Sequence, residues 1–325
     1  MAKRRGSRSV GSVWCRAVLA GVVVIAAPHA SAATFFVTNA NDAGPGSLRQ
    51  AMLSANATPG LDAISFGISL PPGALATIAP LTPLPDITDA LSINGYTQAG
   101  TAKNSLPTGF NAVVRIRISG ASAGAGAAGF VIKVTQVTID GLIIDGFGGG
   151  AIRVVAGTPA SAIVITGCVI GKGYGAAPLA GNLRGVSVEA VPNTRIGGHL
   201  DEDHNLIAGN QQEGLLISGV GATNTTIRGN LIGLNGSGAA EGNRYGVRVL
   251  GGSVAIGMAS VGGGNTIAAS AEVDVSIESG AALLVANRIG VDPAACRVAP
   301  RPSASCSVAP RPAASASRPS PPATS

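Results

Sequence analysis

The sequence is poor in aromatic and charged residues: aromatic residues make up 3% of the 325 positions and charged residues 12%. The one tryptophan, Trp14, lies in an N-terminal segment that we expect to be removed. A platform for stacking on sugar rings would therefore have to come from Tyr96, Tyr174 or Tyr245. These tyrosines do not align in the repeat described below, so we expect no aligned aromatic platform.

Cysteine is also scarce, and three residues lie beyond the N-terminal segment: Cys168, Cys296 and Cys306. In an oxidising compartment Cys296 and Cys306 could close a small loop, although a fold of this length needs no disulfide. Cys168 falls in a predicted strand, at a repeat position typical of an ordinary turn or core residue. We do not expect it to be catalytic.

The central part of the chain has no excess of basic residues. The 22 Lys and Arg residues include five in residues 1–33 and four in residues 293–325, which leaves 13 against all 16 Asp and Glu residues, a net charge of −3. A nucleic-acid-binding protein would carry a basic stripe on its folded part. We therefore expect no nucleic-acid partner.

No apolar run reaches the roughly 20 residues that a membrane-spanning helix needs. The run at residues 17–27 follows a basic stretch and precedes the small-residue segment 28–33, which is the pattern of a cleaved secretory signal. Residues 1–33 are thus predicted to be a signal peptide, with no transmembrane segment after its removal. The mature protein is expected to be secreted, periplasmic or held at the cell surface.

Self-similarity at a spacing of about 60 residues is the strongest signal in the sequence. Residues 205–208 (NLIA) recur as residues 265–268 (NTIA), and residues 185–188 recur as residues 246–249. Within each repeat, short segments alternate apolar and polar residues with period two and are separated by glycine and asparagine, which excludes long helices. Segments this short bury an apolar face only by stacking, about 4.8 Å apart. The sequence therefore predicts an all-β, single-stranded right-handed parallel β-helix with two coils in each repeat.

The repeat assigns inward and outward side chains. Two inward columns are predicted, and a slip of one residue would turn either toward water. They consist of Ile152, Val186, Leu215, Val247 and Val275, and of Val154, Val188, Ile217, Val249 and Ile277. Asparagines recur just before strands, where this residue tolerates left-handed backbone and its amide can bond to the next coil. They are Asn205, Asn230, Asn265 and Asn287, which we interpret as a structural ladder, with a ligand-binding row as the alternative.

The N-terminal part begins with a predicted strand at residues 34–37 and a turn. Ser47 is the expected N-cap of a short helix from Leu48 to about Ala57, and a strand resumes at residues 64–66. A solenoid needs a polar-faced cap over its first coil, and this helix is the natural candidate.

Residues 36–51, which read FVTNANDAGPGSLRQA, resemble the opening of secreted bacterial right-handed β-helix proteins. The match continues to Phe66, and the units around Asn205 and Asn230 resemble the repeats of the same proteins, so that the resemblance covers residues 35–292. It implies a pectin-lyase-like fold and a cell-surface habit. It implies no particular reaction, because this fold carries lyases, hydrolases and adhesins alike.

The predicted organisation is a signal peptide (1–33), an N-terminal cap with the first coils (34–118), the β-helix repeats (119–292) and a disordered tail (293–325). The tail consists mainly of Ala, Pro, Ser and Arg, a composition that cannot bury a core. By the repeat, another coil should follow Asp292. The tail is either a native linker or the product of a shortened or shifted reading frame.

Three aspartates are the candidates for acid–base catalysis. A glycosidase needs two carboxyl groups about 5–10 Å apart. Asp140 and Asp145 flank one predicted strand, and Asp140 aligns with Asp203 two coils later. Asp145 aligns with Ala208 and then Ala268, so no row of acids forms. The alternative interpretation is that these aspartates are solvated strand ends or bond to turns.

A second candidate is the segment from His199 to His204, which holds three acidic residues between two histidines. A flexible loop could bring His199, Asp201, Asp203 and His204 together around a divalent cation. The aligned segment 259–264 contains no metal ligand, which favours a charged surface loop between coils.

Glycan-cleaving β-helices place carboxylates and basic residues together on an outward face. The predicted outward row beside the inward columns has no carboxylate: it is Arg153, Ser187, Leu216, Arg248 and Ser276. Arg115 and Arg117 share one face of a predicted strand, where they could meet an acidic sugar or form a solvent-exposed edge that discourages strand addition.

Together these features favour an exported, non-catalytic β-helix that acts as a structural or adhesion module, with glycans or other surface components as possible partners and no cofactor. The alternative is a polysaccharide lyase or glycoside hydrolase of the pectin-lyase-like fold, which rests on the analogy of fold.

Overall fold

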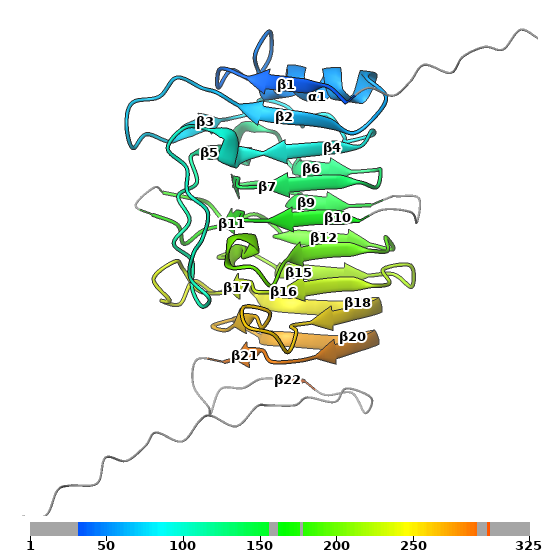
Figure 1. Cartoon of the computed structure of the whole chain (residues 1–325). Helices are drawn as coiled ribbons and strands as arrows, with labels where there is room; N and C mark the ends of the chain where they lie inside the picture. Colours follow the sequence, from blue (N-terminus) through cyan, green and yellow to red (C-terminus); the bar gives the residue numbers. More distant parts are fainter. Residues whose placement is uncertain (1–31, 156–161, 176–177, 291–297, 300–325) are drawn as a thin grey trace, which may run out of the picture.

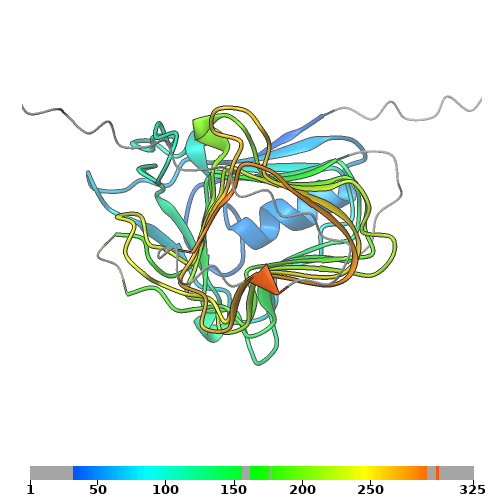
Figure 2. The same ribbon diagram turned by 90° about the horizontal axis from the view of Figure 1, so that it is seen from below.

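The computed structural model describes residues 32–155, 162–175, 178–290 and the backbone of residues 298–299. These residues form a solenoid-like stack in which every pairing between named strands is parallel (Figure 1). Viewed along the stack, the strands of successive coils overlie one another around a common interior (Figure 2). None of the described helices is long and apolar enough to cross a membrane.

The strands form three rows, and rows 1 and 2 join into one sheet through the two 12-residue strands β18 and β20. Row 1 contains β6 (Ala128–Ile132), β9 (Gly150–Val154), β12 (Val186–Glu189), β15 (Glu213–Ser218), the first halves of β18 (Tyr245–Ile256) and β20 (Val273–Leu284), and β22 (Val298–Ala299).

Row 2 contains β1 (Thr34–Val37), β2 (Asp62–Phe66), β4 (Leu91–Asn94), β7 (Val137–Asp140), β10 (Ile163–Thr166), β13 (Thr194–Gly197), β16 (Thr225–Arg228) and the second halves of β18 and β20. Row 3 is a separate sheet of β3 (Ala76–Ile78), β5 (Ile116–Ser119), β8 (Ile143–Asp145), β11 (Val169–Gly171), β14 (Leu206–Ala208), β17 (Leu231–Ile232), β19 (Thr266–Ile267) and β21 (Arg288–Ile289).

One strand from each row makes a coil, so β9, β10 and β11 form one coil and β12, β13 and β14 the next. Leu215 pairs with Val247, and Val247 pairs with Val275, so residues 60 positions apart lie two coils apart in one column. Both inward columns predicted from the repeat are confirmed, because all ten side chains are buried and each is in register with its neighbours. The predicted outward row is also in register.

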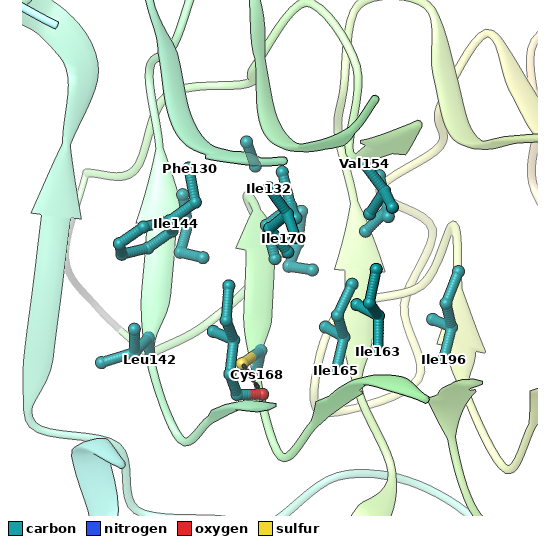
Figure 3. Close-up of a cluster of buried hydrophobic side chains, with 14 of the residues drawn as sticks. Phe130, Ile132, Leu142, Ile144, Val154, Ile163, Ile165, Cys168, Ile170 and Ile196 are labelled. Carbon is teal, nitrogen blue, oxygen red and sulfur yellow. Dashed lines mark hydrogen bonds between the residues drawn. The ribbon is translucent and has the colours of Figure 1, made fainter. Parts of the chain in front are cut away.

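Isoleucine fills the interior sides of rows 2 and 3. The inward column of row 3 is Ile78, Ile118, Ile144, Ile170, Ile207, Ile232, Ile267 and Ile289. Figure 3 shows members of both rows in the same apolar core, with Ile144 and Ile170 from row 3 and Ile163, Ile165 and Ile196 from row 2. Isoleucine suits this column because a β-branched side chain packs well on a pleated strand.

The α-helix α1 (Leu48–Ala57), the only one in the described residues, contacts β1 and β2 at the first coil, and Figure 2 shows it lying lengthwise across the interior outlined by the coils. The side chain of Ser47 accepts a hydrogen bond from the amide of Gln50, which confirms the predicted N-cap. Leu48, Ala51, Met52 and Ala55 are its buried residues. Three short 3-10 helices, η1 (Gly95–Thr97), η2 (Gly120–Ser122) and η3 (Asp201–Asp203), interrupt the turns.

The asparagine ladder is confirmed at the turn between rows 2 and 3. The Nδ2 atoms of Asn205, Asn230 and Asn265 each donate to the Oδ1 of the next asparagine, at 2.9, 2.9 and 2.8 Å, ending at Asn287. None of these asparagines has a positive φ, so the expected left-handed backbone is wrong for them. Cys168 occupies the same place one coil earlier, in a turn and not in a strand, and its amide donates to Asn205.

A second ladder lies on the other side of row 3 and has no counterpart in the sequence predictions. Asn182 donates to Asn210 at 3.0 Å, and Asn210 donates to Asn243 at 2.9 Å. All three side chains are buried, so each hydrogen bond between their amide groups replaces a hydrogen bond to water that is lost on folding. The two ladders fix the turns that flank every strand of row 3 in the middle of the stack.

Row 3 departs from the expected alternation in the middle of the stack, because its outward side chains Ile143, Val169, Leu206 and Leu231 are also buried. A segment that we name the strap, residues 100–114, runs down the outside of row 3 from the early coils (Figure 1). Its residues Phe110, Ala112 and Val114 form a second apolar cluster with the outward side chains of row 3. Its Asn104 donates to the carbonyl oxygen of Asp201, 97 positions away.

Several predictions concern residues outside the described part of the chain. These include nearly all of the predicted signal peptide, Cys296, Cys306 and most of the tail. Val298 and Ala299 are the exception: they form β22, which pairs with Val275 and Ser276 of β20, although the sequence predicts no regular structure there.

Candidate functional site

Asp140 ends β7, at the turn from row 2 to row 3, and lies among polar side chains from four segments. Its Oδ1 accepts a hydrogen bond from the Thr166 hydroxyl at 3.1 Å, and its Oδ2 lies 3.6 Å from the ammonium group of Lys103 at the start of the strap. Its side chain is 12% exposed. Burial raises the pKa of Asp140, and the lysine and the Thr166 hydroxyl reduce that shift without cancelling it.

Asp203 lies near Asp140, although not through the predicted alignment. Asp140 is in register with Thr166 in the next coil, and Ile165 is in register with Ile196 in the coil after that. The position two coils from Asp140 is therefore Gly197, and the expected alignment of Asp140 with Asp203 is wrong. Asp203 instead reaches this region from η3, in the loop after β13, and its backbone oxygen accepts a hydrogen bond from Gly167. Its negative charge adds to the upward shift of the pKa of Asp140. The Oδ2 of Asp203 is itself paired with Arg195 at 2.9 Å.

Tyr96 completes this group. Its hydroxyl donates to the carbonyl oxygen of Gly167 at 2.9 Å, and Lys103 lies 5.5 Å from the centre of its ring. Burial, followed by the nearby Cys168 and Asp140, raises the pKa of Tyr96. Gly167 has a φ of 59° and lies so close to Tyr96 and Asp140 that a β-carbon there would collide with both. The site thus brings together a carboxyl group with a raised pKa, a second carboxyl group paired with an arginine, and one lysine.

Cys168 lies behind this group and is fully buried. Burial raises the pKa of its thiol to about 12, so the thiolate needed for nucleophilic chemistry does not form near neutral pH. The expectation of an ordinary buried residue agrees with this environment.

Asp145 does not join Asp140. It is fully buried and accepts two hydrogen bonds from Arg117, at 2.8 and 2.7 Å, and one from the amide of Ala180 at 2.9 Å. Asp145 is in register with Ser119, and Gly171 of the next coil is in register with Ala208. None of these neighbours of Asp145 in the column is acidic, so Asp145 does not belong to a row of acids.

Asp145 is fully buried and is therefore not a solvated strand end, although its bond to the amide of Ala180, between β11 and β12, agrees with the interpretation that these aspartates bond to turns. The solvent edge predicted for Arg117 is not present, because its guanidinium group pairs with Asp145. A buried carboxylate needs a paired cation, and Arg117 supplies it.

The four predicted metal ligands do not converge. No group of three or more His, Cys, Asp and Glu side chains in the described part of the chain could hold a metal ion. His199 is exposed, whereas His204 is buried and its Nε2 lies 3.1 Å from the carbonyl oxygen of Gly262. Burial lowers the pKa of His204, so the ring is neutral at pH 7. Asp201 and Asp203 lie in η3, so the segment is only partly the exposed loop that the alternative interpretation describes.

The outer face of row 1 carries a network of ion pairs that the sequence analysis missed. The predicted outward row lacks carboxylates, but the neighbouring positions supply them. Each pair links two adjacent coils. The pairs are Arg153 with Glu189 at 3.2 Å, Arg184 with Glu213 at 2.8 Å, Arg248 with Glu213 at 3.2 Å, Arg248 with Glu278 at 2.6 Å and Arg244 with Glu272 at 2.6 Å.

Tyr245 and Glu213 are the centre of that network. Arg248 lies 4.7 Å and Arg244 5.6 Å from the centre of the Tyr245 ring. The Glu213 side chain is 4% exposed and lies between Arg184 and Arg248, which come from the preceding and following coils. The sequence carries no regular signal for it, because Glu189 and Glu278 each follow a member of the outward row by two positions, whereas Glu213 precedes Leu216 by three.

Comparisons with known proteins give no family for this chain: no protein-family model matches it, and no curated protein matches its sequence. The chemistry of the two regions therefore has to be judged from the side chains alone.

Proposed function

We propose that this protein is an exported, non-catalytic β-helix that serves as a structural spacer or adhesion module at the cell surface. The observation that carries the proposal is the position of Glu213 between Arg184 and Arg248. A carboxylate whose two oxygens pair with arginines from the two neighbouring coils joins those coils, and a side chain that is 4% exposed offers little surface to a substrate. The strand face on which glycan-cleaving β-helices carry their catalytic groups is used here to join coils.

The proposal includes a right-handed coil and a pectin-lyase-like arrangement. The parallel three-row stack and the general preference for right-handed crossovers support the handedness. The N-terminal resemblance supports export, because residues 36–51 resemble the opening of secreted bacterial right-handed β-helix proteins.

The test is to incubate the purified secreted protein, immobilised on beads, with a panel of neutral and acidic polysaccharides. New reducing ends or unsaturated uronates would overturn the proposal. Polysaccharide retained on the beads with unchanged chain length identifies an adhesion module, and neither retention nor cleavage identifies a spacer. Beads that carry heat-unfolded protein control for non-specific retention.

A glycoside hydrolase is the second candidate function, because the surroundings of Asp140 and Asp203 differ in the manner that acid–base chemistry requires. Burial raises the pKa of Asp140, as a general acid requires, whereas Asp203 is paired with Arg195 at 2.9 Å. If the polysaccharide panel reveals cleavage, Asp140→Asn and Asp203→Asn should each abolish it. Asp86→Asn, which alters an exposed pair with Lys133, is the matched control and should leave cleavage unchanged.

A further inference from the structure

The outward column of row 3 changes from apolar to polar residues beside the turn of the strap at residues 107–109. Its apolar members Ile143, Val169, Leu206 and Leu231 are buried in the second apolar cluster, together with residues of the strap. The next two positions in the column are polar, Thr266 and then Arg288. The strap therefore covers the apolar part of the column, and the stack continues for two further strands, β19 and β21, beyond it.

A cavity of about 170 Å³ lies at this point. The strap turn at residues 107–109 borders one side, and the loop at residues 260–264 borders another. The turns of Asn230 and Asn265 contribute to the lining, together with Leu231, Thr266 and Arg288 of the outward column. A cavity of about 150 Å³ holds one benzene molecule, so this space suits one small molecule of about six or seven non-hydrogen atoms.

The walls of the cavity are fixed by close contacts. The ring of His204 packs against Gly229, where a β-carbon would collide with the imidazole. Its Nε2 lies 3.1 Å from the carbonyl oxygen of Gly262, an acceptor, so this nitrogen carries the proton and donates. Gly262 has a φ of 75° and no space for a side chain beside the backbone of His199. The buried ring of His204 thus donates the hydrogen bond that holds the loop at residues 260–264 beside the cavity.

The polar groups of the lining select a ligand with one negative charge. Arg288 is the one permanently charged side chain among the described lining residues, and no carboxylate of the described residues lies within ion-pair distance of it. The hydroxyl oxygen of Ser260 is buried and has no hydrogen-bond partner among the described residues. A buried hydroxyl without a partner costs free energy that a ligand hydroxyl would recover.

We propose that this cavity binds one small hydroxycarboxylate, with the carboxylate on Arg288 and a hydroxyl group on Ser260. The planar guanidinium group matches a carboxylate through two parallel hydrogen bonds. A doubly charged phosphate ester is disfavoured, because the lining supplies no second cation. This site is separate from the row 1 face and from Asp140, and it stands whether or not the proposed function is correct.

The test compares glycerate with glycerol, which have the same three-carbon skeleton and differ in the carboxylate. Saturation-transfer NMR on the full secreted protein should show binding of glycerate, and binding of glycerol should be roughly tenfold weaker or more, because a charge-assisted pair is lost. Arg288→Gln should remove the preference for glycerate. Ser260→Ala should weaken both ligands by roughly threefold to tenfold, because each loses one hydrogen bond.

Arg244→Gln is the matched control, because it removes an arginine on the outer face of row 1 and should leave glycerate binding unchanged. Thermal unfolding of each variant confirms that the fold is retained. The proposal is overturned if glycerol binds as well as glycerate, if Arg288→Gln retains the preference, if inorganic phosphate displaces glycerate at lower concentration than glycerate itself binds, or if wild-type protein binds no glycerate at millimolar concentration.

Discussion

Arg117 holds the fully buried carboxylate of Asp145 with two hydrogen bonds of 2.8 and 2.7 Å, from the strand that precedes β8 in row 3. The arginine side chain is itself 16% exposed. A carboxylate placed in the interior has to be paired, because the free energy of removing it from water exceeds what packing returns.

Arg117→Ala should therefore destabilise the protein by about 3–5 kcal/mol, because it leaves a buried charge unpaired. Arg153→Ala is the control: it breaks a pair in which both side chains are 39% exposed, and it should cost about 0–1 kcal/mol. Urea unfolding followed by circular dichroism measures both. The double variant Arg117→Met with Asp145→Leu should recover most of the loss, and similar costs for Arg117→Ala and Arg153→Ala would contradict the interpretation.

Leu215→Asp should prevent folding or reduce stability by several kcal/mol, because the side chain is fully buried in an inward column between Val186 and Val247. Leu216→Asp changes the adjacent outward residue and should be tolerated. The measurements are the yield of secreted protein and the far-ultraviolet circular dichroism. Unchanged secretion and dichroism for Leu215→Asp would contradict its inward orientation.

Asn230→Asp should destabilise the protein by about 2 kcal/mol or more. The Nδ2 of Asn230 donates to the carbonyl oxygen of Ile196 and to Oδ1 of Asn265, and a carboxylate would place an acceptor against both acceptors. Asn41→Asp, at an exposed turn, is the matched control and should have little effect. Thermal unfolding distinguishes the two, and equal melting temperatures would show that the ladder contributes nothing.

Asp140→Asn should make the protein more stable than wild type near pH 7. Burial raises the pKa of Asp140 in the folded state, so the folded protein binds this proton more tightly than the unfolded chain does, and ionisation costs stability as the pH rises through the folded pKa. The difference in melting temperature between variant and wild type should shrink as the pH is lowered toward about 4. A difference that stays constant over this range would contradict the raised pKa. Burial lowers the pKa of His204, so this residue makes the stability rise with pH. The effect is the same in the variant and the wild type, and it cancels in the difference between their melting temperatures.

The sequence predicted the core of row 1 well and the surface poorly. Leu215 and Val275 could be assigned to one column because an apolar alternation of period two, repeated every two coils, leaves one register that buries every member. The same pattern says nothing of Glu189 and Glu278, because outward charges can pair along the stack or point to water without altering the repeat.

Row 3 was misjudged for a different reason. In Val169 and Ile170, or Leu206 and Ile207, both neighbours are apolar, a pattern typical of a strand covered on both faces. The pattern indicates that something covers the outer face, and it does not say that the cover is the strap. Asp140 and Asp203 illustrate the same limit: the repeat placed them in one row, whereas a loop brings them near each other.

The sequence by itself determined the period, the inward columns, the first asparagine ladder and the capped helix α1, because each depends on side chains at fixed short spacings or on a repeated register. Tertiary structure alone decided how the strap covers row 3, how Arg117 reaches Asp145, where the cavity beside Arg288 lies and which charges pair across row 1. These contacts join segments far apart in the chain, such as Asn104 and Asp201, and no local pattern encodes such a meeting. Their positions follow from the length and path of the loops between coils.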